Sequence, residues 1–413
     1  MAVIAVLGTL DTKGEEHRFI ADRIRERGHS PLLIDVGTGA APKITPDVSR
    51  EEVAQAAGLT LAEMIQGDDR GAAVAAMAKA APLLLARLQR EGRIEGVISL
   101  GGGGGTAIAT AAMRALPIGA PKLMVSTLAS GNTAPYVGTK DITMMPSIVD
   151  VAGLNRVSRV IFSRAAGAIC GMVEASITAE NERPLIVASM FGNTTECVSA
   201  AVPILEQAGY EVVVFHSTGT GGRAMESLIE SGMVAGVLDI TTTEWADELV
   251  GGVLSAGPER LSSAAKAGVP AIVTPGCLDM VNFGEPSTIP DQFADRNFYH
   301  HNPQVTLMRT NAQECRQLGS ILAEKINTYT APVTVLIPRG AISVISAPAK
   351  PFYDEAADTT LFESLTEKLR ADIPVKSLDC EINDPSFAQA CAEALLKNIA
   401  AHRQRGVSAA SPG

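Results

Sequence analysis

Aromatic residues are scarce in this chain: Phe, Trp and Tyr make up 4% of its 413 residues, although 46% of the residues are hydrophobic. This composition is typical of Ala, Val, Ile and Leu packing helices onto sheets. It disfavours the aromatic stacking platforms that bind single-stranded nucleic acids. A basic stripe is also missing, because the net charge is −11 and charges of both signs are interspersed. We therefore expect no nucleic-acid partner.

The six cysteines form no C-x-x-C pair and no short disulfide framework, which favours a reducing compartment. The N-terminal run MAVIAVLGTL enters a strand-like pattern without the basic start and long apolar core of a signal peptide. The most apolar stretch, residues 71–88, is interrupted by Lys79, Pro82 and Arg87, so it predicts soluble helices rather than a membrane span. We expect a cytoplasmic protein with no membrane role.

The order of sequence signals in the first half of the chain is repeated in the second half. VIAVLGT, an amphipathic stretch and PLLIDVGTG correspond to LIVASMFG, a second amphipathic stretch and EVVVFHSTGTGG. Val6 and Val187 lie 181 positions apart, and so do Gly28 and Gly209. We interpret this as duplication of one strand-helix-strand unit; chance similarity between two such units is the alternative.

Short apolar strands alternate with helices in each half, which predicts an α/β fold with two Rossmann-like parallel-sheet lobes related by internal duplication. The length agrees, because one hydrophobic core rarely supports a chain of more than about 300 residues. We expect a first lobe at residues 1–180 with a helical insertion at 40–90, and a second lobe at 181–403. A linker is expected at 181–184 and a disordered tail at 404–413.

Eight parallel strands are predicted to end at Leu7, Asp35, Leu100, Ser126, Ser189, Phe215, Asp239 and Thr274. The C-terminal part adds a strand VTVLIP, a helix near residues 360–370, a strand PVKSL and a last helix from Pro385. In such sheets, ligands bind beyond the C-terminal ends of the strands, so we sought candidate residues in the loops there.

A run of five glycines follows the strand GVISL and precedes a helix predicted to begin at Thr106. Backbone amides without side chains can surround an anion, and a helix N-terminus adds positive potential. The G-K-[ST] motif of a P-loop is absent, and no acid lies about 20 residues on to hold the ribose of NAD. We interpret the run as a phosphate cradle in which some glycine needs positive φ or close approach of a ligand; tight packing is the alternative. The cradle residues are Gly101, Gly102, Gly103, Gly104, Gly105 and Thr106.

Two further polar loops are expected at the same edge. Lys13 can neutralise a phosphate, whereas Asp11 can either cap the following helix or hold Mg²⁺. The remaining candidates of these loops are Thr9, Thr12, Ser126, Ser130, Gly131 and Asn132.

The second lobe has a related edge, where we expect a second anion-binding nest and an acidic strand end suited to a sugar, an amine or a metal. Its candidates are His216, Thr218, Gly219, Gly221, Gly222, Asp239 and Glu244. Cys277 is interpreted as a structural thiol, with a nucleophile as the alternative. His300 and His301 are interpreted as solvated or structural, with metal ligation alongside Asp279 or Glu244 as the alternative.

The strings GTLDTKG, GVISLGGGGGT, VFHSTGTGGRAMESLI, GVLDITTTEWAD and HNPQVTLMRT, in this order, resemble a family shared by bacteria, fungi and plants. It is the family of the N-terminal domain of the tomato mosaic virus resistance protein. The resemblance implies a two-lobed Rossmann-like fold that binds ATP with Mg²⁺ and forms homodimers. It also implies a separate TIM-barrel-like partner protein, because many relatives carry such a domain. The plant pattern has a serine within the glycine run, a difference that a backbone cradle tolerates.

The resulting hypothesis is an ATP-binding (nucleotide-binding) protein of metabolism, acting as a small-molecule kinase, ligase or ATPase on an unknown small molecule in the cleft between the lobes. One alternative is a nucleotide-regulated protein-binding module without turnover. Another is a nucleotide-independent isomerase or lyase. Analysis of the reaction products separates these hypotheses, and the choice of co-substrate depends on loop geometry rather than on motif spacing.

Overall fold

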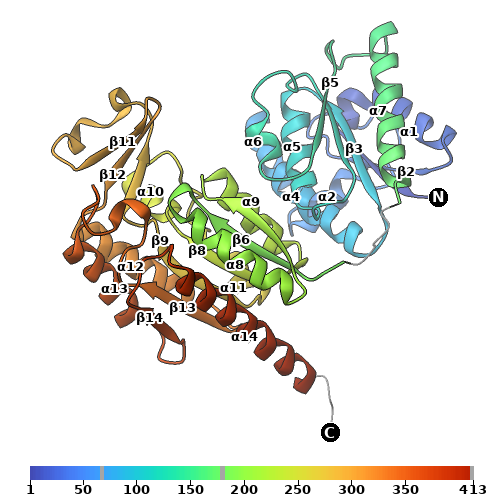
Figure 1. Ribbon diagram of the computed structural model, residues 1–413. Coiled ribbons are helices and arrows are strands. Elements are labelled where there is room, and N and C mark those ends of the chain that lie inside the picture. The colour runs from blue at the N-terminus through green and yellow to red at the C-terminus, as the bar shows by residue number, and fades with distance from the viewer. Residues whose placement is uncertain (66–68, 177–181, 410–413) are drawn as a thin grey trace. The chain divides into compact units, whose positions relative to one another are not determined.

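The computed structural model describes residues 1–65, 69–176 and 182–409. The chain is divided into two compact units, unit 1 (Met1–Ala179) and unit 2 (Glu180–Gly413) (Figure 1). The predicted linker at 181–184 begins within a segment outside the described residues. Each unit has its own sheet and core, and each is described by itself.

Unit 1 contains a five-stranded parallel sheet with strand order β2-β1-β3-β4-β5. Its strands are β1 (Val3–Gly8), β2 (Ser30–Asp35), β3 (Gly96–Gly101), β4 (Lys122–Ser126) and β5 (Thr143–Pro146). Its helices are α1 (Leu10–Glu26), α2 (Arg50–Ala56), α3 (Leu61–Met64), α4 (Arg70–Arg90), α5 (Gly103–Arg114), α6 (Ala134–Val137) and α7 (Arg156–Glu174).

Helices cover both faces of this sheet (Figure 1). Because successive side chains of a strand point to opposite faces, Ile4 and Val6 pack with residues of α1 and α7, whereas Ala5 and Leu7 pack with residues of α4 and α5. Burial on both faces explains why β1 is a continuous apolar run.

Helix α4 is, by length and composition alone, apolar enough to cross a membrane, which is weak evidence for a span. Its buried residues, including Met77, Leu84 and Leu88, belong to the core that α5 and α2 complete. We therefore assign α4 as a core helix of unit 1.

Unit 2 contains a six-stranded parallel sheet with strand order β14-β13-β9-β8-β6-β7 and a three-stranded antiparallel sheet with order β10-β12-β11. Its strands are β6 (Leu185–Met190), β7 (Glu211–His216), β8 (Val234–Thr241), β9 (Ala271–Gly276), β10 (Met280–Phe283), β11 (Phe298–Asn302), β12 (Val305–Arg309), β13 (Val333–Pro338) and β14 (Val375–Leu378). Its α-helices are α8 (Thr195–Gln207), α9 (Thr220–Glu230), α10 (Glu244–Val250), α11 (Ser263–Ala267), α12 (Ala312–Ile326), α13 (Glu355–Lys368) and α14 (Pro385–Ala409). Short 3₁₀ helices are η1 (Gly192–Thr194), η2 (Pro286–Thr288), η3 (Asp291–Phe293) and η4 (Val344–Ser346).

The first four strands of each unit have the same order, β2-β1-β3-β4 in unit 1 and β7-β6-β8-β9 in unit 2. The turns after the first helices also agree, because Gly28 has φ 83° and Gly209 has φ 92°. Left-handed backbone at the same place in both copies explains why glycine recurs there. The prediction of two Rossmann-like lobes with one strand order is confirmed.

Two details differ from the sequence predictions. The excursion at residues 40–90 contains α2, α3 and α4, but α4 is the crossover helix from β2 to β3 and thus corresponds to α9; the extra segment ends before it. Residues 404–409, predicted as disordered, continue helix α14 to Ala409, and the remainder of the predicted tail lies outside the described residues.

Candidate functional site

A pocket of about 480 Å³ opens at the C-terminal edge of the unit 1 sheet. It lies between the loop after β1 and the loop after β3, the two neighbouring strands at which the strand order reverses. Ligands of open α/β sheets bind at this position. The pocket, called the glycine-lined pocket below, is lined by Thr9, Asp11, Thr12, Lys13, Thr38, Gly39, Ala40, Ile65, Asp69, Arg70, Ala73, Val74, Gly102, Gly103, Gly104, Gly105 and Ile108.

The glycine run forms one wall of this pocket. Helix α5 begins at Gly103 rather than at Thr106, and Gly102 is its N-cap without a side-chain capping bond. The amide of Thr106 donates to the Gly102 carbonyl at 2.8 Å and is the first to find an acceptor within the helix. The amides of residues 103–105 therefore remain available to an anion.

The run adopts no left-handed backbone, because no residue from 101 to 105 has positive φ. Of the two predicted reasons for the glycines, positive φ does not apply, since three of the five glycines are in the first turn of a right-handed helix; close approach of a ligand remains a prediction. Packing explains Gly101, whose Cβ would lie 3.2 Å from Cα of Gly105. Packing against the described part of the chain does not explain Gly103, whose Cβ would meet nothing there within 4 Å, or Gly104, whose Cβ would lie 3.7 Å from Val74.

Thr9 and the first turn of α1 form another wall. Lys13 interrupts α1 with φ −125° and ψ 30°, and its ammonium donates to the carbonyl of Val151. The Nδ1 atom of the fully buried His17 lies 2.7 Å from the Lys13 carbonyl. Burial lowers the pKa of His17, which favours a neutral ring. This ring lies beside the Lys13 carbonyl, at the point where the backbone of α1 departs from helical geometry.

Asp11 joins two loops of the pocket. One carboxylate oxygen accepts from the amide of Thr12 at 2.8 Å, and the other accepts from the amide of Gly39 at 2.9 Å. These bonds give Asp11 a role in organising backbone. Within the described ranges, no group of three or more His, Cys, Asp or Glu residues is placed to hold a metal ion.

Other predicted residues do not reach the pocket. The hydroxyls of Thr106 and Ser126 are buried and lie 2.7 Å from each other, so they pair internally. Ser130, Gly131 and Asn132 are exposed after β4 and are not part of the lining.

Helices α3 and α4 contribute a further wall, which was not predicted from the sequence. Asp69 and Arg70 begin α4, while Ile65, Ala73 and Val74 supply apolar surface. The available signal was the long connection between β2 and β3, which must pass the C-terminal edge of the sheet.

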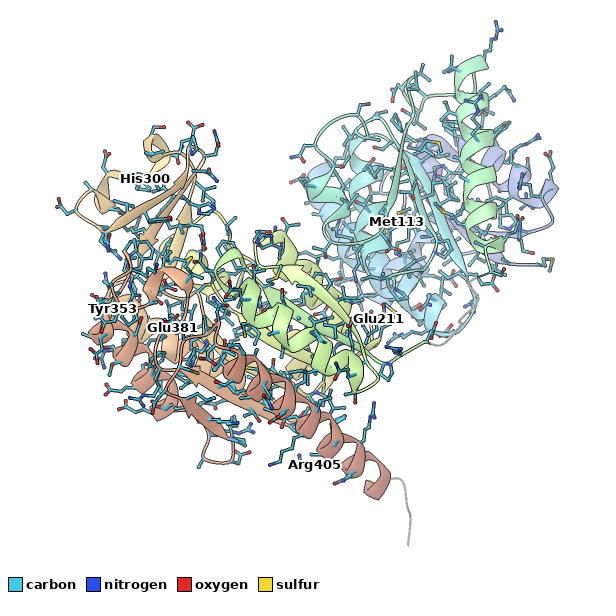
Figure 2. The ribbon with its side chains drawn as sticks, in the orientation of Figure 1. Met113, Glu211, His300, Tyr353, Glu381 and Arg405 are labelled. Atoms are coloured by element: carbon cyan, nitrogen blue, oxygen red, sulfur yellow. The ribbon has the colours of Figure 1, made fainter. Side chains whose placement is uncertain are left out.

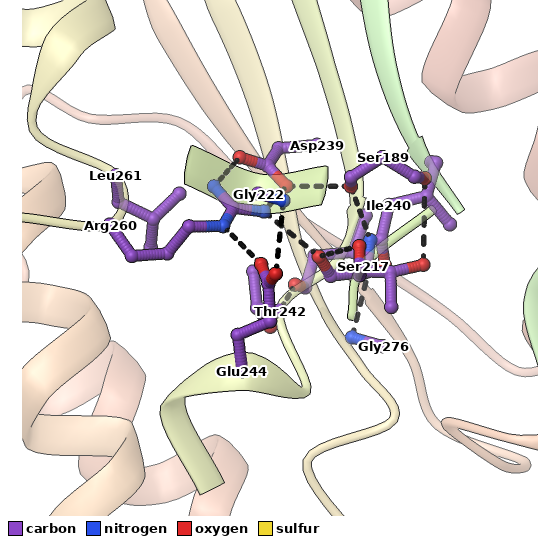
Figure 3. Close-up of polar contacts among 12 residues, drawn as sticks. Ser189, Ser217, Gly222, Asp239, Ile240, Thr242, Glu244, Arg260, Leu261 and Gly276 are labelled. Atoms are coloured by element: carbon purple, nitrogen blue, oxygen red, sulfur yellow. Dashed lines mark hydrogen bonds and ion pairs between the residues drawn. The ribbon is translucent and has the colours of Figure 1, made fainter. Parts of the chain in front are cut away.

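The corresponding edge of unit 2 is filled by its own side chains (Figure 3). Arg260, 1% exposed, donates to both carboxylate oxygens of Asp239 at 2.6 and 2.7 Å. It also donates to Glu244 at 2.7 Å and to Glu226 at 3.1 Å. An internal guanidinium therefore occupies the acidic edge predicted for a sugar, an amine or a metal, and Asp239 and Glu244 are corrected to structural residues.

The predicted anion nest of unit 2 is likewise occupied. One oxygen of Glu244 accepts from the amides of Gly219 at 2.7 Å and Gly222 at 3.1 Å. Burial raises the pKa of Glu244, although Arg260 opposes that shift. A Cβ on Gly222 would lie 2.2 Å from this carboxylate, and one on Gly221 would lie 1.8 Å from the His216 carbonyl. These glycines serve packing, so the nest is corrected to an internal contact.

His216 and Thr218 remain in this loop without an assembled site. The His216 ring is 5.4 Å from the ring of Phe191, and Thr218 donates to the His216 carbonyl at 3.3 Å. The first contact joins the ends of the neighbouring strands β6 and β7, and the second lies within the loop.

Cys277 and the two histidines also have structural surroundings. Cys277 is fully buried with φ 59°, and burial raises its pKa, which favours the structural interpretation. Asp279 is fully buried and accepts from Ser343 at 2.7 Å. His300 and His301 are exposed on β11 of the antiparallel sheet (Figure 2).

Two doubly wound parallel sheets, one with a glycine-lined pocket at its switch point, define a two-unit Rossmann-like α/β protein. Models of the N-terminal and C-terminal domains of the uncharacterised protein family UPF0261 match residues 2–178 and 183–399. The chain belongs to this family.

Among its relatives, a UPF0261 protein of Clostridium tetani is 49% identical over 395 residues, covering 95% of this chain and 98% of the relative. The ToMV resistance protein Tm-1(GCR237) of Solanum lycopersicum is 39% identical over 416 residues, covering 95% of this chain but 55% of that protein. The predicted resemblance is thus confirmed. A UDP-N-acetylglucosamine 2-epimerase from Rickettsia bellii aligns with 65% of this chain and 78% of its own, at 10% identity and a TM-score of 0.22, too weak a likeness to carry an argument.

Proposed function

We propose that unit 1 binds a nucleoside triphosphate, ATP with Mg²⁺ by preference, in the glycine-lined pocket. The observation that carries this proposal is the glycine wall. Residues 102–105 line the pocket, and among the described residues outside their own helix the Cβ atoms they lack would contact nothing closer than 3.7 Å. Glycine in a helix destabilises the fold by roughly 0.5–1 kcal/mol relative to alanine, so a role in close ligand approach accounts for glycines that packing does not require.

The pocket has a polar part and an apolar part, as a nucleotide requires. Lys13, the threonine hydroxyls and the free α5 amides would contact the phosphates. Ile65, Val74 and Ile108 would contact the base and ribose. The volume of about 480 Å³ lies within the usual range for small-molecule sites.

The pocket also offers oxygen donors that suit Mg²⁺. Asp11 and Asp69 lie in the lining together with the hydroxyls of Thr9 and Thr12. A magnesium ion held by one or two carboxylates and the phosphates would neutralise the phosphate charge. Lys13 would then orient the terminal phosphate.

Calorimetric titration with ATP·Mg, ADP, GTP, NAD and sugar phosphates tests this proposal. A one-site ligand at 100 times its dissociation constant stabilises a fold by roughly 2.7 kcal/mol, so a thermal-shift assay gives an independent readout.

We predict that Gly103→Val abolishes ATP binding, because its side chain enters the pocket and not the protein core. The matched control is Gly171→Val, an exposed position of α7 whose Cβ would also meet nothing within 4 Å. Gly222→Val is unsuitable as a control, because it would collide with Glu244. Equal ATP affinity in Gly103→Val and Gly171→Val would place the nucleotide elsewhere.

Product analysis separates the forms of the proposed function. Formation of ADP or AMP with a co-substrate supports a kinase, ligase or ATPase, and tight binding without turnover supports a regulated binding module. Indifference to nucleotide supports an isomerase or lyase. The implied homodimer and a separate TIM-barrel-like partner are further parts of the proposal, tested by sedimentation equilibrium and by purification from the native source.

A further inference from the structure

Lys13 borders two cavities. It lines the glycine-lined pocket, and it also lines a second cavity of about 290 Å³ beside the first turns of α1. The second cavity is bounded by α1, Lys43 and the loop at residues 147–155, which joins β5 to α7 and is called the β5–α7 loop below. Lys13 is therefore a shared wall between the proposed phosphate site and the β5–α7 loop.

Two polar contacts hold the β5–α7 loop to α1. The ammonium of Lys13 donates to the carbonyl of Val151, and the carboxylate of Glu16 accepts from the amide of Gly153 at 2.6 Å. Val151 is itself fully buried among the side chains of α1 and α7. The position of the loop therefore depends on its contacts with the first turns of α1.

The β5–α7 loop contains a residue in an unfavourable backbone conformation. Ile148 has φ 65°, a region that a β-branched residue rarely adopts, and its side chain is 73% exposed. Burial of Ile148 cannot compensate for that conformation. Ser147 closes the turn around Ile148: its carbonyl accepts from the amide of Val149 at 2.7 Å and its hydroxyl donates to the Val149 carbonyl at 2.6 Å. The contacts to α1 anchor the same loop further along, at Val151 and Gly153.

We propose that Lys13 is a latch that couples phosphate binding to the β5–α7 loop. An ammonium binds a charged phosphate more strongly than a neutral carbonyl, because the hydrogen bond is charged at both ends. A phosphate in the glycine-lined pocket therefore draws Lys13 away from Val151, and the loop loses one of its two contacts. This inference rests on the proposed function. Through the latch, nucleotide binding would change the conformation of the β5–α7 loop at the protein surface.

Hydrogen exchange followed by mass spectrometry tests the latch in the full chain. The amide of Gly153 and that of Val149, which donates to the Ser147 carbonyl at 2.7 Å, report loop opening. In the wild type, saturating ATP·Mg should increase their exchange roughly tenfold, the factor expected for loss of one charge-assisted hydrogen bond. Lys13→Ala should show that faster exchange without nucleotide and no further increase with it.

Lys43→Ala is the matched control. Lys43 lines the second cavity and donates to the Thr12 carbonyl at 3.4 Å, but it is not part of the glycine-lined pocket. The loop amides of the Lys43→Ala variant should exchange at the wild-type rate and respond to nucleotide as those of the wild type do. Lys13→Met, which keeps the apolar stem, repeats the test if Lys13→Ala alters thermal unfolding.

The outcomes distinguish the latch from the proposed function. If ATP protects residues 101–105 while loop exchange is unchanged, the latch is wrong and the nucleotide site stands. If calorimetry detects no nucleotide binding, the proposed function and the latch both fail. Unchanged basal loop exchange in Lys13→Ala and Lys13→Met also overturns the latch.

Discussion

Replacement of Arg260 by methionine should destabilise unit 2 severely. The guanidinium is 1% exposed and is the countercharge for Asp239, Glu244 and Glu226, all within 3.1 Å. Methionine retains much of the apolar stem but leaves these buried carboxylates without a partner. Removing one member of a buried ion pair costs about 3–5 kcal/mol, and several orphaned acids place this variant at the upper end of that range or beyond it.

Urea unfolding, monitored by tryptophan fluorescence, measures this change in stability within unit 2. Trp245, the only tryptophan of the chain, is 5% exposed on α10, beside Glu244. The control is Arg339→Met, whose side chain is 57% exposed and lies 3.8 Å from Asp379. An exposed pair of this kind contributes at most about 1 kcal/mol.

The loss caused by Arg260→Met should depend on pH. Burial raises the pKa of Glu244, and removal of the guanidinium removes the main opposing influence. An acid whose pKa is higher in the folded than in the unfolded state favours folding at low pH, and this contribution is lost as the pH rises through the folded pKa. The gap between variant and wild type should therefore narrow from pH 8 to pH 5. A loss below about 1 kcal/mol at pH 8, or one equal to that of Arg339→Met, would refute this account.

Two further predictions concern single positions. Burial raises the pKa of Asp247 to about 7, so the stability this group contributes at low pH is lost as the pH rises through 7. Asp247→Asn should therefore flatten the pH dependence of the urea midpoint reported by Trp245 between pH 5 and 8, because an amide does not ionise. The new amide can also donate to the buried Oδ1 of Asn282, which has no partner in the part of the chain that the structure describes. In unit 1, Gly28→Ala should cost about 1 kcal/mol because φ is 83°, whereas Gly171→Ala should gain about 0.5–1 kcal/mol in an exposed helix; scanning calorimetry checks both, and equal signs would contradict them.

The parallel strands could be predicted from the sequence because they are buried on both faces. Such strands are apolar runs bounded by glycine or polar residues, and the predicted ends fall within two residues of the observed ones, as at Leu7 against Gly8 and Asp239 against Thr241. Strand β5 and the antiparallel sheet were missed. Strands β5 and β11 are partly exposed, and three consecutive polar residues end β11, so no apolar run marks them. Strands β10 and β12 are largely buried but have only 4 and 5 residues, with Asn282, Thr306 and Arg309 interrupting the apolar pattern.

The two candidate edges show where local sequence is insufficient. The glycine-lined pocket was found in part because its phosphate-facing residues follow strand ends directly. Its α3–α4 wall was missed because that contact is tertiary. In unit 2, Asp239 and Glu244 were misinterpreted because their partner Arg260 lies 21 and 16 positions further along the chain, in a loop without any motif.

Because of the Glu244 carboxylate, the two units should differ in how their stability depends on ligands in solution. The carboxylate is a tethered anion, held beside the Gly219 and Gly222 amides at an effective concentration that no free phosphate in solution reaches. The order of that loop is therefore independent of the metabolite pool. Under the proposed function, only unit 1 would gain stability as nucleotide concentration rises. Added ATP·Mg should then raise the melting temperature of unit 1 and leave that of unit 2 unchanged, so that one half of the chain responds to nucleotide while the other supplies a constant framework.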